Sequence, residues 1–471
     1  MKLLDQGYVQ VVKIARWDNR ECNQKYRLSR YCFLYEEEGL FLLRNMFTGQ
    51  LYRLTREEWD IISQLNVTMQ DPDYLRANML TDLAVYQCIV PADYNEFAEY
   101  SYLVDILGIM RKKKVKGYTH YTIFPTTACN AQCAYCFENG YLIRTMDEKT
   151  ARATATFIDQ TKGEKMLHLA WFGGEPMLGS RYIGLICQQL KDRNISFYSS
   201  MATNGSLFTS EMAERSVKDW NLKKIQLSVD GSRDDYEKRK RYKQPALYNY
   251  DSAIQAIYEL EKQGIDIRIR CNYDHENIGG LAGFVEDVGK RFGGSPYVSL
   301  YFAVLFQERD NGTAPELIRR IREIEDFADS YGLIGKKKKK KGTFPLNFCM
   351  ADNLDENIVI DPEGYLYDCE NLPQEHCFGN VREGITDQKL FADLKKTLEP
   401  LQECIECAFL PLCTPHRKTV CEMEKKWPCK EIRKAEMENA LHRTARRIRE
   451  ASENEKPSNA ALYDEVSEGR V

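Results

Sequence analysis

Three cysteines lie close together in the first half of the chain, in the sequence Cys129-Asn-Ala-Gln-Cys133-Ala-Tyr-Cys136. This C-x3-C-x2-C spacing puts three thiolates on one short loop, where they can hold three irons of a 4Fe–4S cubane. Most such clusters have four cysteine ligands, so three leave one iron free to bind another molecule. The alternatives are a zinc site whose fourth ligand lies elsewhere and three cysteines that share no ligand.

A second candidate element is the turn Gly173-Gly174-Glu175-Pro176, which begins about 40 residues after the middle cysteine of the loop. Two glycines let the backbone approach a ligand closely, and the carboxylate of Glu175 can accept a hydrogen bond from an ammonium group. Turns of this composition are common, so the motif alone does not identify a ligand.

Polar side chains end three further strand-like segments, and their hydroxyl, amide, carboxylate and guanidinium groups can hold a polar ligand. They are Thr203, Asn204, Ser228, Asp230, Arg270 and Asn272. Asn-Gly and Asp-Gly pairs also favour ordinary turns, which is the alternative interpretation for Asn204 and Asp230. Arg270 could pair with a carboxylate or be a surface side chain.

The chain has sixteen cysteines, and half of them lie in its last third. In a long chain whose start has no apolar signal segment, clustered cysteines indicate metal ligation in a reducing compartment rather than disulfides. The cysteines of this third region are Cys349, Cys369, Cys377, Cys404, Cys407, Cys413, Cys421 and Cys429. By themselves they would also fit a zinc ribbon.

A regular alternation of strand-like and helical segments surrounds the first two motifs. The strand-like segments are residues 118–124, 167–172, 196–202, 224–230, 266–272 and 297–306. The helical patterns between them are residues 148–160, 182–193, 211–219, 250–263 and 281–291. This alternation predicts a parallel α/β fold, either a partial barrel or a doubly wound sheet. Sites in such folds lie at the carboxyl ends of the strands, where the candidate residues are found.

The first hundred residues predict a small unit of strands followed by helices. Strand-like segments at residues 31–35, 40–44 and 50–54 precede a helix that starts at Thr55, with Glu58 completing a capping box. Further helical stretches are expected near residues 73–79 and 83–88. A lysine run at residues 336–341 is interpreted as a solvated linker rather than a binding patch.

The bulk composition is that of an ordinary globular protein of two or three domains. The net charge of −4 gives no general electrostatic argument for binding nucleic acid or membranes, and no stretch approaches 18 apolar residues. We therefore expect a cytoplasmic protein that binds neither nucleic acid nor membrane.

The C-x3-C-x2-C loop resembles the signature of radical S-adenosylmethionine (SAM) enzymes. The resemblance implies that the cluster's unique iron chelates the amino and carboxylate groups of SAM, which is cleaved to a 5′-deoxyadenosyl radical. Tyr135 matches the aromatic that packs on adenine in that family, although a core-packing role is the simpler alternative. The Gly173–Pro176 turn resembles the family's motif for the SAM amino group, and the strand-end residues from Thr203 to Asp230 resemble its ribose and carboxylate contacts.

The third region resembles the SPASM domain, which carries two auxiliary 4Fe–4S clusters. The resemblance implies that Cys404, Cys407, Cys413 and Cys429 hold auxiliary cluster II, and that Cys349, Cys369 and Cys421 hold auxiliary cluster I. The chain departs from the family spacing at Cys421, because seven residues separate it from Cys413 where the family has three. Cys377 is therefore the other candidate for cluster I. With only three ligands, cluster I would have an open iron able to bind a substrate thiolate.

The first region resembles a RiPP recognition element, a winged-helix-like domain that pairs a leader peptide with a sheet edge; the alternative is a structural cap. We therefore expect a recognition domain at 1–105, a partial (β/α)6 barrel at 106–330, a SPASM domain at 331–440, and a helix end with a disordered tail at 441–471. The implied cofactors are SAM and three 4Fe–4S clusters. The implied partners are a precursor peptide with a leader and a flavodoxin- or ferredoxin-like reductant.

Enzymes with this architecture generally modify peptides, and the leading hypothesis is a sactipeptide- or ranthipeptide-type maturase that forms thioether cross-links. Carbon–carbon cross-linking is one alternative. Another is an anaerobic sulfatase maturase, which is expected to use an aspartate directly after the second SPASM cysteine. Here Cys369 is flanked by Asp368 and Glu370. A non-catalytic winged-helix regulator would leave the strand-end motifs without a purpose.

Overall fold

The computed structural model describes residues 2–5, 25–67, 70, 72–78, 80, 83–84, 86–114, 117–335, 353–395, 402–413 and 429–454. Two of the proposed cluster ligands, Cys349 and Cys421, lie outside these residues. The lysine run at 336–341 and the chain from residue 455 onward also lie outside them.

The central feature is a row of parallel strands that follow one another in sequence order. They are β7 (His120–Thr126), β8 (Leu167–Gly173), β9 (Phe197–Thr203), β10 (Leu222–Ser228), β11 (Asp266–Tyr273) and β12 (Val298–Val304). Each pairs in parallel with the next, and β12 and β7 are at opposite ends of the row. The predicted α/β fold with six barrel strands is confirmed. In the described residues β12 does not pair with β7, so the row stays open as a partial barrel.

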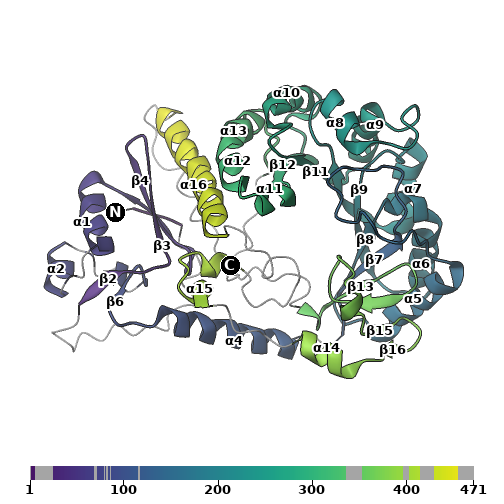
Figure 1. Cartoon of the computed structure of the whole chain (residues 1–471), viewed down its shortest axis with the longest axis horizontal. Coiled ribbons are helices and arrows are strands. Elements are labelled where there is room, and N and C mark those ends of the chain that lie inside the picture. Colours follow the sequence, from purple (N-terminus) through teal and green to yellow (C-terminus); the bar gives the residue numbers. More distant parts are fainter. Residues whose placement is uncertain are drawn as a thin grey trace.

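Helices connect these strands and cover their outer face (Figure 1). They are α5 (Glu148–Thr161), α6 (Ser180–Asp192), α7 (Ser210–Trp220), α8 (Arg233–Lys240), α9 (Tyr250–Lys262) and α10 (Leu281–Phe292). Five of these were predicted from their apolar period, whereas the strongly charged α8 was not. Beyond β12 lie α11 (Phe306–Asp310), α12 (Ala314–Arg320) and α13 (Arg322–Ser330).

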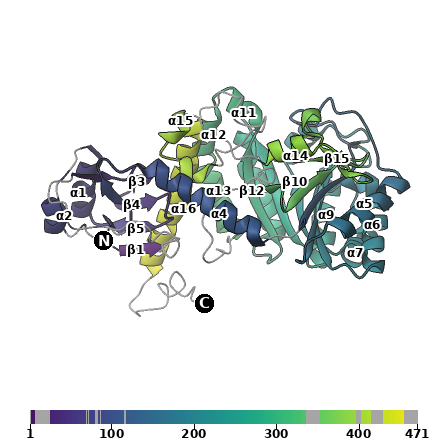
Figure 2. The ribbon, with the colours of Figure 1, turned by 90° about the horizontal axis from the view of Figure 1, so that it is seen from below.

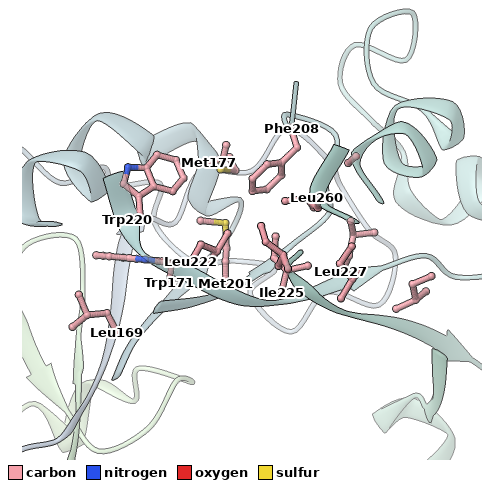
Figure 3. Close-up of a cluster of buried hydrophobic side chains, with 14 of the residues drawn as sticks. Leu169, Trp171, Met177, Met201, Phe208, Trp220, Leu222, Ile225, Leu227 and Leu260 are labelled. Atoms are coloured by element: carbon pink, nitrogen blue, oxygen red, sulfur yellow. The ribbon is translucent and has the colours of Figure 1, made fainter. Parts of the chain in front are cut away.

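The main core lies between the strands and these helices. Figure 3 shows Trp171 of β8 and Met201 of β9 packed with Trp220 at the end of α7 and Leu260 of α9. Each of the four side chains is at most 2% exposed. Burying one large apolar side chain stabilises a fold by about 1.5–3 kcal/mol, so this layer holds the strand ends rigidly in register.

The third region continues the barrel sheet. Strand β13 (Asn357–Ile360) pairs in parallel with β7, and β14 (Tyr365–Tyr367), β15 (Gly379–Asn380) and β16 (Gly384–Ile385) follow in antiparallel order. The sheet therefore has ten strands in the described residues. This extension, which was not predicted, brings the segment after residue 353 directly beside the strand that leads into the cysteine loop.

The N-terminal unit contains a four-stranded sheet in the order β1-β5-β4-β3. Its strands are β1 (Lys2–Asp5), β3 (Cys32–Glu37), β4 (Leu40–Asn45) and β5 (Leu51–Leu54). Helix α1 (Arg56–Val67) starts with the predicted capping box, in which Glu58 N donates to Thr55 Oγ1 at 3.2 Å and Thr55 N donates to Glu58 Oε2 at 2.8 Å. Helix α2 (Pro72–Ala77) follows, and a second small sheet pairs β2 (Tyr26–Leu28) with β6 (Ile89–Pro91).

Two long helices lie between the N-terminal unit and the barrel (Figures 1 and 2). Helix α4 (Glu96–Lys114) runs across the expected boundary at residue 105, and α16 (Cys429–Asn454) across that at residue 440. Helix α16 packs against α12 on one side and β3 on the other. Among the described residues, no helix is long and apolar enough to cross a membrane.

Candidate active site

The cysteine loop begins directly after β7 ends at Thr126. The pKa of the Cys129 thiol is raised to about 12, mainly by burial and to a smaller extent by the carboxylate of Glu175 and the thiols of Cys133 and Cys136. All three thiols are therefore within electrostatic range of one another at the carboxyl end of the first barrel strand. An iron–sulfur cluster at this loop would remove these thiol protons, since a coordinating cysteine binds as the thiolate.

The loop backbone is fixed by the end of α8 and the segment that follows it. The amide of Gln132 donates to the carbonyl oxygen of Lys240 at 3.0 Å, and the amide of Ala134 donates to that of Arg239 at 3.3 Å. In return, Lys243 donates from its amide to the Asn130 carbonyl at 2.9 Å and from Nζ to the Cys129 carbonyl at 2.8 Å. The cysteine loop is thus held by β7 and by the α8 connection.

The Gly173-Gly174 pair lets the second motif pack directly on the cysteine loop. A Cβ on Gly174 would lie 2.5 Å from the carbonyl oxygens of both Thr127 and Ala128, and Gly173 has a φ of +115°. Both positions therefore require glycine. The amide of Glu175 donates to the Ala128 carbonyl at 2.8 Å, which locks the two motifs together.

Glu175 is fully buried between β8 and β9. Its Oε1 accepts from the hydroxyl of Thr203 at 2.8 Å and its Oε2 from the amide of Asn204 at 2.9 Å. Burial raises the pKa of Glu175, and these hydrogen bonds oppose that shift. Pro176, also buried, begins the short helix η1 (Pro176–Gly179). The structure brings together the predicted residues of these two strand ends.

Asp230 and Lys240 form a buried ion pair beside the cysteine loop. Lys240 Nζ is 3.0 Å from Asp230 Oδ2 and also donates to Ser228 Oγ at 2.7 Å and to the Tyr135 hydroxyl at 2.9 Å. The Tyr135 hydroxyl in turn donates to Asp230. Although burial favours the neutral carboxyl, the Lys240 ammonium and the Tyr135 hydroxyl hold the pKa of Asp230 below its usual value.

The other oxygen of Asp230 faces β11. Asp230 Oδ1 accepts from the amide of Asn272 at 3.0 Å and from its side-chain Nδ2 at 2.8 Å. Arg270 is two residues earlier on β11 and donates from Nε to Asn272 Oδ1 at 2.9 Å. It is therefore linked to Asp230 through Asn272. The residues predicted at three strand ends, from β9 to β11, are therefore linked in hydrogen-bonded groups at one end of the barrel.

Sequence analysis missed Lys240, Asn130 and Ser206. Lys240 is only 2% exposed, although it ends the charged run RDDYEKRK, which has no apolar period and is typical of a solvated helix. Asn130 Oδ1 accepts from Asn204 Nδ2 at 2.8 Å, and its own Nδ2 donates to Ser206 Oγ at 2.9 Å. The only available signal was position: Asn130 lies inside the cysteine loop and Ser206 directly follows the Asn204-Gly205 turn.

Four cysteines of the third region gather near the N-terminal unit. Cys404, Cys407 and Cys413 lie on the segment 402–413, which contains α15 (Gln402–Ile405) and η5 (Leu410–Leu412). The pKa of the Cys404 thiol is raised by burial, by Glu403 and then by the thiols of Cys407, Cys413 and Cys429. The other three proposed ligands of auxiliary cluster II are thus within electrostatic range of Cys404.

The described cysteines of auxiliary cluster I lie elsewhere, beside the barrel mouth. Cys369 is buried just after β14, and Cys377 packs with Phe124 and Tyr367. Among the described residues, no group of three or more Cys, His, Asp or Glu side chains is arranged to hold a single metal ion. The assignment of either auxiliary cluster is therefore a proposal about these cysteines.

Comparison with known proteins agrees with the barrel and its loop. Residues 123–286 match the family model described as the Radical SAM superfamily. Residues 123–286 form a radical SAM domain. The matched segment includes the cysteine loop, the Gly173–Pro176 turn and the Asp230–Lys240 pair. The chain is therefore an enzyme with the radical SAM fold.

Three similar proteins illustrate how far the likeness extends. An uncharacterized protein of Methanocaldococcus jannaschii is 24% identical over 57% of this chain and 91% of its own length. The GTP 3′,8-cyclase of Clostridium perfringens is 23% identical over 61% of this chain and 92% of its own. The structure of anSMEcpe with bound AdoMet and the Cp18Cys peptide has a TM-score of 0.52 and 15% identity, covering 71% of this chain and all of that one. At this identity the likeness shows the fold of the radical SAM domain.

Proposed function

We propose that the radical SAM domain binds a 4Fe–4S cluster through Cys129, Cys133 and Cys136 and binds SAM beside it. The single observation that carries this proposal is that Glu175 and Lys240 bind the backbone in and next to the three-cysteine loop, while Asp230 binds the Tyr135 hydroxyl within it. When bound, SAM and the clusters supply the radical that removes a hydrogen atom from substrate and the electron acceptor that bond closure requires.

The buried charges suit the polar groups of SAM. Glu175 is a buried acceptor at the glycine turn and fits the SAM ammonium, because its Oε2 accepts one hydrogen bond, from the Asn204 amide, and has a second lone pair. Lys240 is a buried cation beside the cysteine loop, so we assign its charge to balance that of the SAM carboxylate, with Asp230, Ser228 and Tyr135 holding its ammonium in place. Tyr135 would present its ring to adenine from the same hydrogen-bonded group. We assign Arg270 a second contact to the SAM carboxylate.

We further propose that the substrate is a cysteine-containing precursor peptide and that the product is a thioether. Closing a C–S bond from a C–H and an S–H group removes two hydrogens. One leaves as a hydrogen atom that converts the 5′-deoxyadenosyl radical to 5′-deoxyadenosine, and the other leaves as a proton and an electron. This proposal follows from the resemblance of the cysteine pattern around Cys369–Cys429 to the SPASM domain, and its electron acceptor is an iron–sulfur cluster of that region.

The N-terminal sheet is the proposed docking place for the peptide. In the described part of the chain, β3 pairs with β4 only, so its other edge has no strand partner. A groove of about 440 Å³ follows this edge and is walled by Cys32–Glu36 on one side and by Lys434 and Glu438 of α16 on the other. Unpaired strand edges bind extended peptides through backbone hydrogen bonds, which supports a recognition role for this unit.

The experiment uses anaerobically reconstituted enzyme with SAM, dithionite and a cysteine-containing peptide encoded beside its gene. The proposal predicts 5′-deoxyadenosine and a peptide mass that falls by two hydrogens, with one thiol fewer available to iodoacetamide. A peptide that loses two hydrogens but retains every thiol would contradict the thioether and indicate a carbon–carbon link. If 5′-deoxyadenosine does not form with any peptide or reductant, the SAM site itself is wrong.

One observation favours a second candidate, the oxidation of a cysteine or serine to formylglycine. Glu138, two residues after the cysteine loop, has a pKa raised to about 7 by burial and then by the charge of Glu370. Glu370 directly follows Cys369, so a carboxyl pair joins the radical SAM domain to the third region and could accept a substrate proton. An aldehyde-reactive hydrazide probe separates the outcomes, because formylglycine reacts with it and a thioether does not.

A further inference from the structure

The N-terminal unit packs directly on the segment that carries Cys404, Cys407 and Cys413. Arg30 Nη1 donates to the Ile405 carbonyl at 3.3 Å, and the rings of Phe33 and Phe409 have centroids 5.9 Å apart. A separate hydrophobic cluster joins Leu410 to side chains before β3 and on α4, with Cys404 packed against it. The proposed ligands of auxiliary cluster II therefore lie against residues from the first hundred positions of the chain.

Two buried tyrosines belong to this cluster, against which Cys404 packs. Tyr31 is 1% exposed, Tyr100 of α4 is 0% exposed, and their ring centroids are 6.5 Å apart. Among the described residues, the Tyr31 hydroxyl is buried without a hydrogen-bond partner. An unsatisfied buried hydroxyl costs stability unless a group supplies the missing bond, so its position requires an explanation.

Cysteine sulfurs are among the groups whose charges act on the two hydroxyls. Burial raises the pKa of Tyr31, with Glu96 and then the Cys407 sulfur among the charges that add to the shift. Burial also raises the pKa of Tyr100, followed by the effects of Tyr31 and the Cys413 sulfur. Each hydroxyl thus lies close to a different proposed ligand of auxiliary cluster II, and neither can ionise near neutral pH.

A cation approaches the same cysteines from α16. Burial by itself lowers the pKa of Arg433, but Glu436 and a hydrogen bond to the Cys413 sulfur raise it, so the guanidinium stays charged. Arg433 Nη1 donates to Glu436 Oε2 at 2.7 Å, which fixes the direction of the side chain. Arg433 is four residues after Cys429, so it lies one turn from the fourth proposed ligand.

We propose that Tyr31, Tyr100 and Arg433 donate hydrogen bonds to the cysteine sulfurs of auxiliary cluster II and thereby set its reduction potential. The inference rests on the ligand set Cys404, Cys407, Cys413 and Cys429 given in the proposed function. Hydrogen bonds and a positive charge at a cluster stabilise the reduced, more negative form and raise the potential. Because Tyr31 lies between β2 and β3, the N-terminal unit becomes part of the environment of the cluster.

The test is an EPR-monitored redox titration of the full-length, anaerobically reconstituted enzyme, comparing wild type with Tyr31→Phe, Tyr100→Phe and Arg433→Gln. The matched controls are Tyr102→Phe, at a residue 55% exposed on the same helix as Tyr100, and Lys434→Gln, which removes the charge next to Arg433. We expect each variant to shift the potential to a more negative value. The three shifts should add up to about 59 mV, which corresponds to a reduction about tenfold less favourable. Potentials equal to those of the controls would overturn the proposal.

Two further measurements separate the ways in which this test can fail. If the double variant Cys404→Ala/Cys407→Ala keeps all iron and every EPR signal, the ligand set in the proposed function is wrong. If that variant loses one cluster while the tyrosine and arginine variants keep wild-type potentials, only this inference is wrong. If a variant loads less iron, pulsed EPR of the reduced wild-type enzyme in D2O replaces the titration. Coupling of the cluster II signal to exchangeable deuterons would support the proposed hydrogen-bond donors. Absence of this coupling would overturn the proposal.

Discussion

The ammonium of Lys240 lies 3.0 Å from a carboxylate oxygen of Asp230, and neither side chain is more than 2% exposed. Two opposite charges this deeply buried are stable only as a pair, because either one alone would be desolvated without compensation. The backbone of Lys240 also anchors the cysteine loop through Gln132. The ion pair therefore couples the fold of the radical SAM domain to the position of its proposed cluster.

The first prediction concerns this pair. Lys240→Met leaves Asp230 buried and uncompensated, which should lower the free energy of unfolding by about 3–5 kcal/mol. Denaturant unfolding of the anaerobic protein measures the change. Lys238→Met, on the exposed face of the same helix, is the matched control and should match wild type.

A double variant tests whether the charge or the packing matters. Lys240→Met/Asp230→Asn removes both charges and should recover more than half of the stability lost in Lys240→Met. A double variant as unstable as the single one would contradict a charge-based explanation. Formation of 5′-deoxyadenosine should stay low in both variants, because the proposed partner of the SAM carboxylate is missing.

The second prediction concerns the contact between the two motifs. Gly174→Ala places a methyl group 2.5 Å from two carbonyl oxygens of the cysteine loop, so the loop must shift. We expect bound iron to fall by about four per chain, the content of one cubane. Gly283→Ala, on helix α10 with nothing within 4 Å of the added Cβ, is the control and should keep full iron. Wild-type iron in Gly174→Ala would show that the tight turn is not needed for the cluster.

The third prediction is a pH dependence of stability that arises inside the barrel. His168 Nδ1 is 2.8 Å from His120 Nδ1, and its Nε2 is 2.7 Å from Ser200 Oγ. Burial, then the charge of His120, lowers the pKa of His168 to about 3. Since an unfolded histidine titrates near 6.5, the unfolded chain binds more protons below neutrality, and stability falls as pH drops.

Thermal denaturation at pH 7.5 and pH 5.5 measures this effect. Each such histidine contributes a slope of at most about 1.4 kcal/mol per pH unit, so His168→Gln should lose less stability than wild type over this range. His275 is the opposite case, because its hydrogen bond to Glu308 raises its pKa. That contribution to stability is present at low pH and is lost as pH rises. The stability that His275→Gln loses relative to wild type should therefore be larger at pH 5.5 than at pH 7.5. Equal pH dependence of stability in wild type and His168→Gln would refute the prediction for His168.

The fourth prediction concerns peptide docking at β3. The hairpin turn at Glu38-Gly39 has positive φ at both residues, and Glu37 pairs with Leu40. In this geometry the backbone N–H and C=O groups of Leu34 point away from β4, toward the groove. Leu34→Pro should therefore abolish peptide modification while peptide-independent SAM cleavage continues. Leu34→Ala keeps the N–H group and should remain active; equal loss in both would indicate side-chain contacts instead.

Much of the fold could be predicted because the barrel follows strong periodic patterns. Buried parallel strands are short apolar runs, and amphipathic helices such as α9 have an apolar period, so both types of segment were found. The capping box at Thr55 and Glu58 is a local signal and was also found. The pairing of β13 with β7 was not predicted, because the two strands are more than two hundred residues apart and the local sequence pattern does not indicate which strands pair.

The candidate site divides in the same way. Glu175, Asp230 and the three cysteines lie in short motifs whose chemistry can be inferred from residue type and spacing. Lys240 lies in a run of charges where Lys238, Arg239 and Lys240 look alike, and only the packing of α8 decides which of them is buried. The contact of Tyr31 with the cysteine segment 402–413 depends on how separate units meet, which the sequence of either unit does not contain.

The central claim is a radical SAM enzyme with two auxiliary clusters, and its most direct test is the iron and acid-labile sulfide content of anaerobically reconstituted protein. Three cubanes predict about twelve of each per chain, falling to about eight when Cys404 and Cys407 are both replaced by alanine. About four irons together with bound zinc would contradict the account. The radical SAM domain would then stand alone beside a zinc module, and the thioether proposal would lose its electron acceptor.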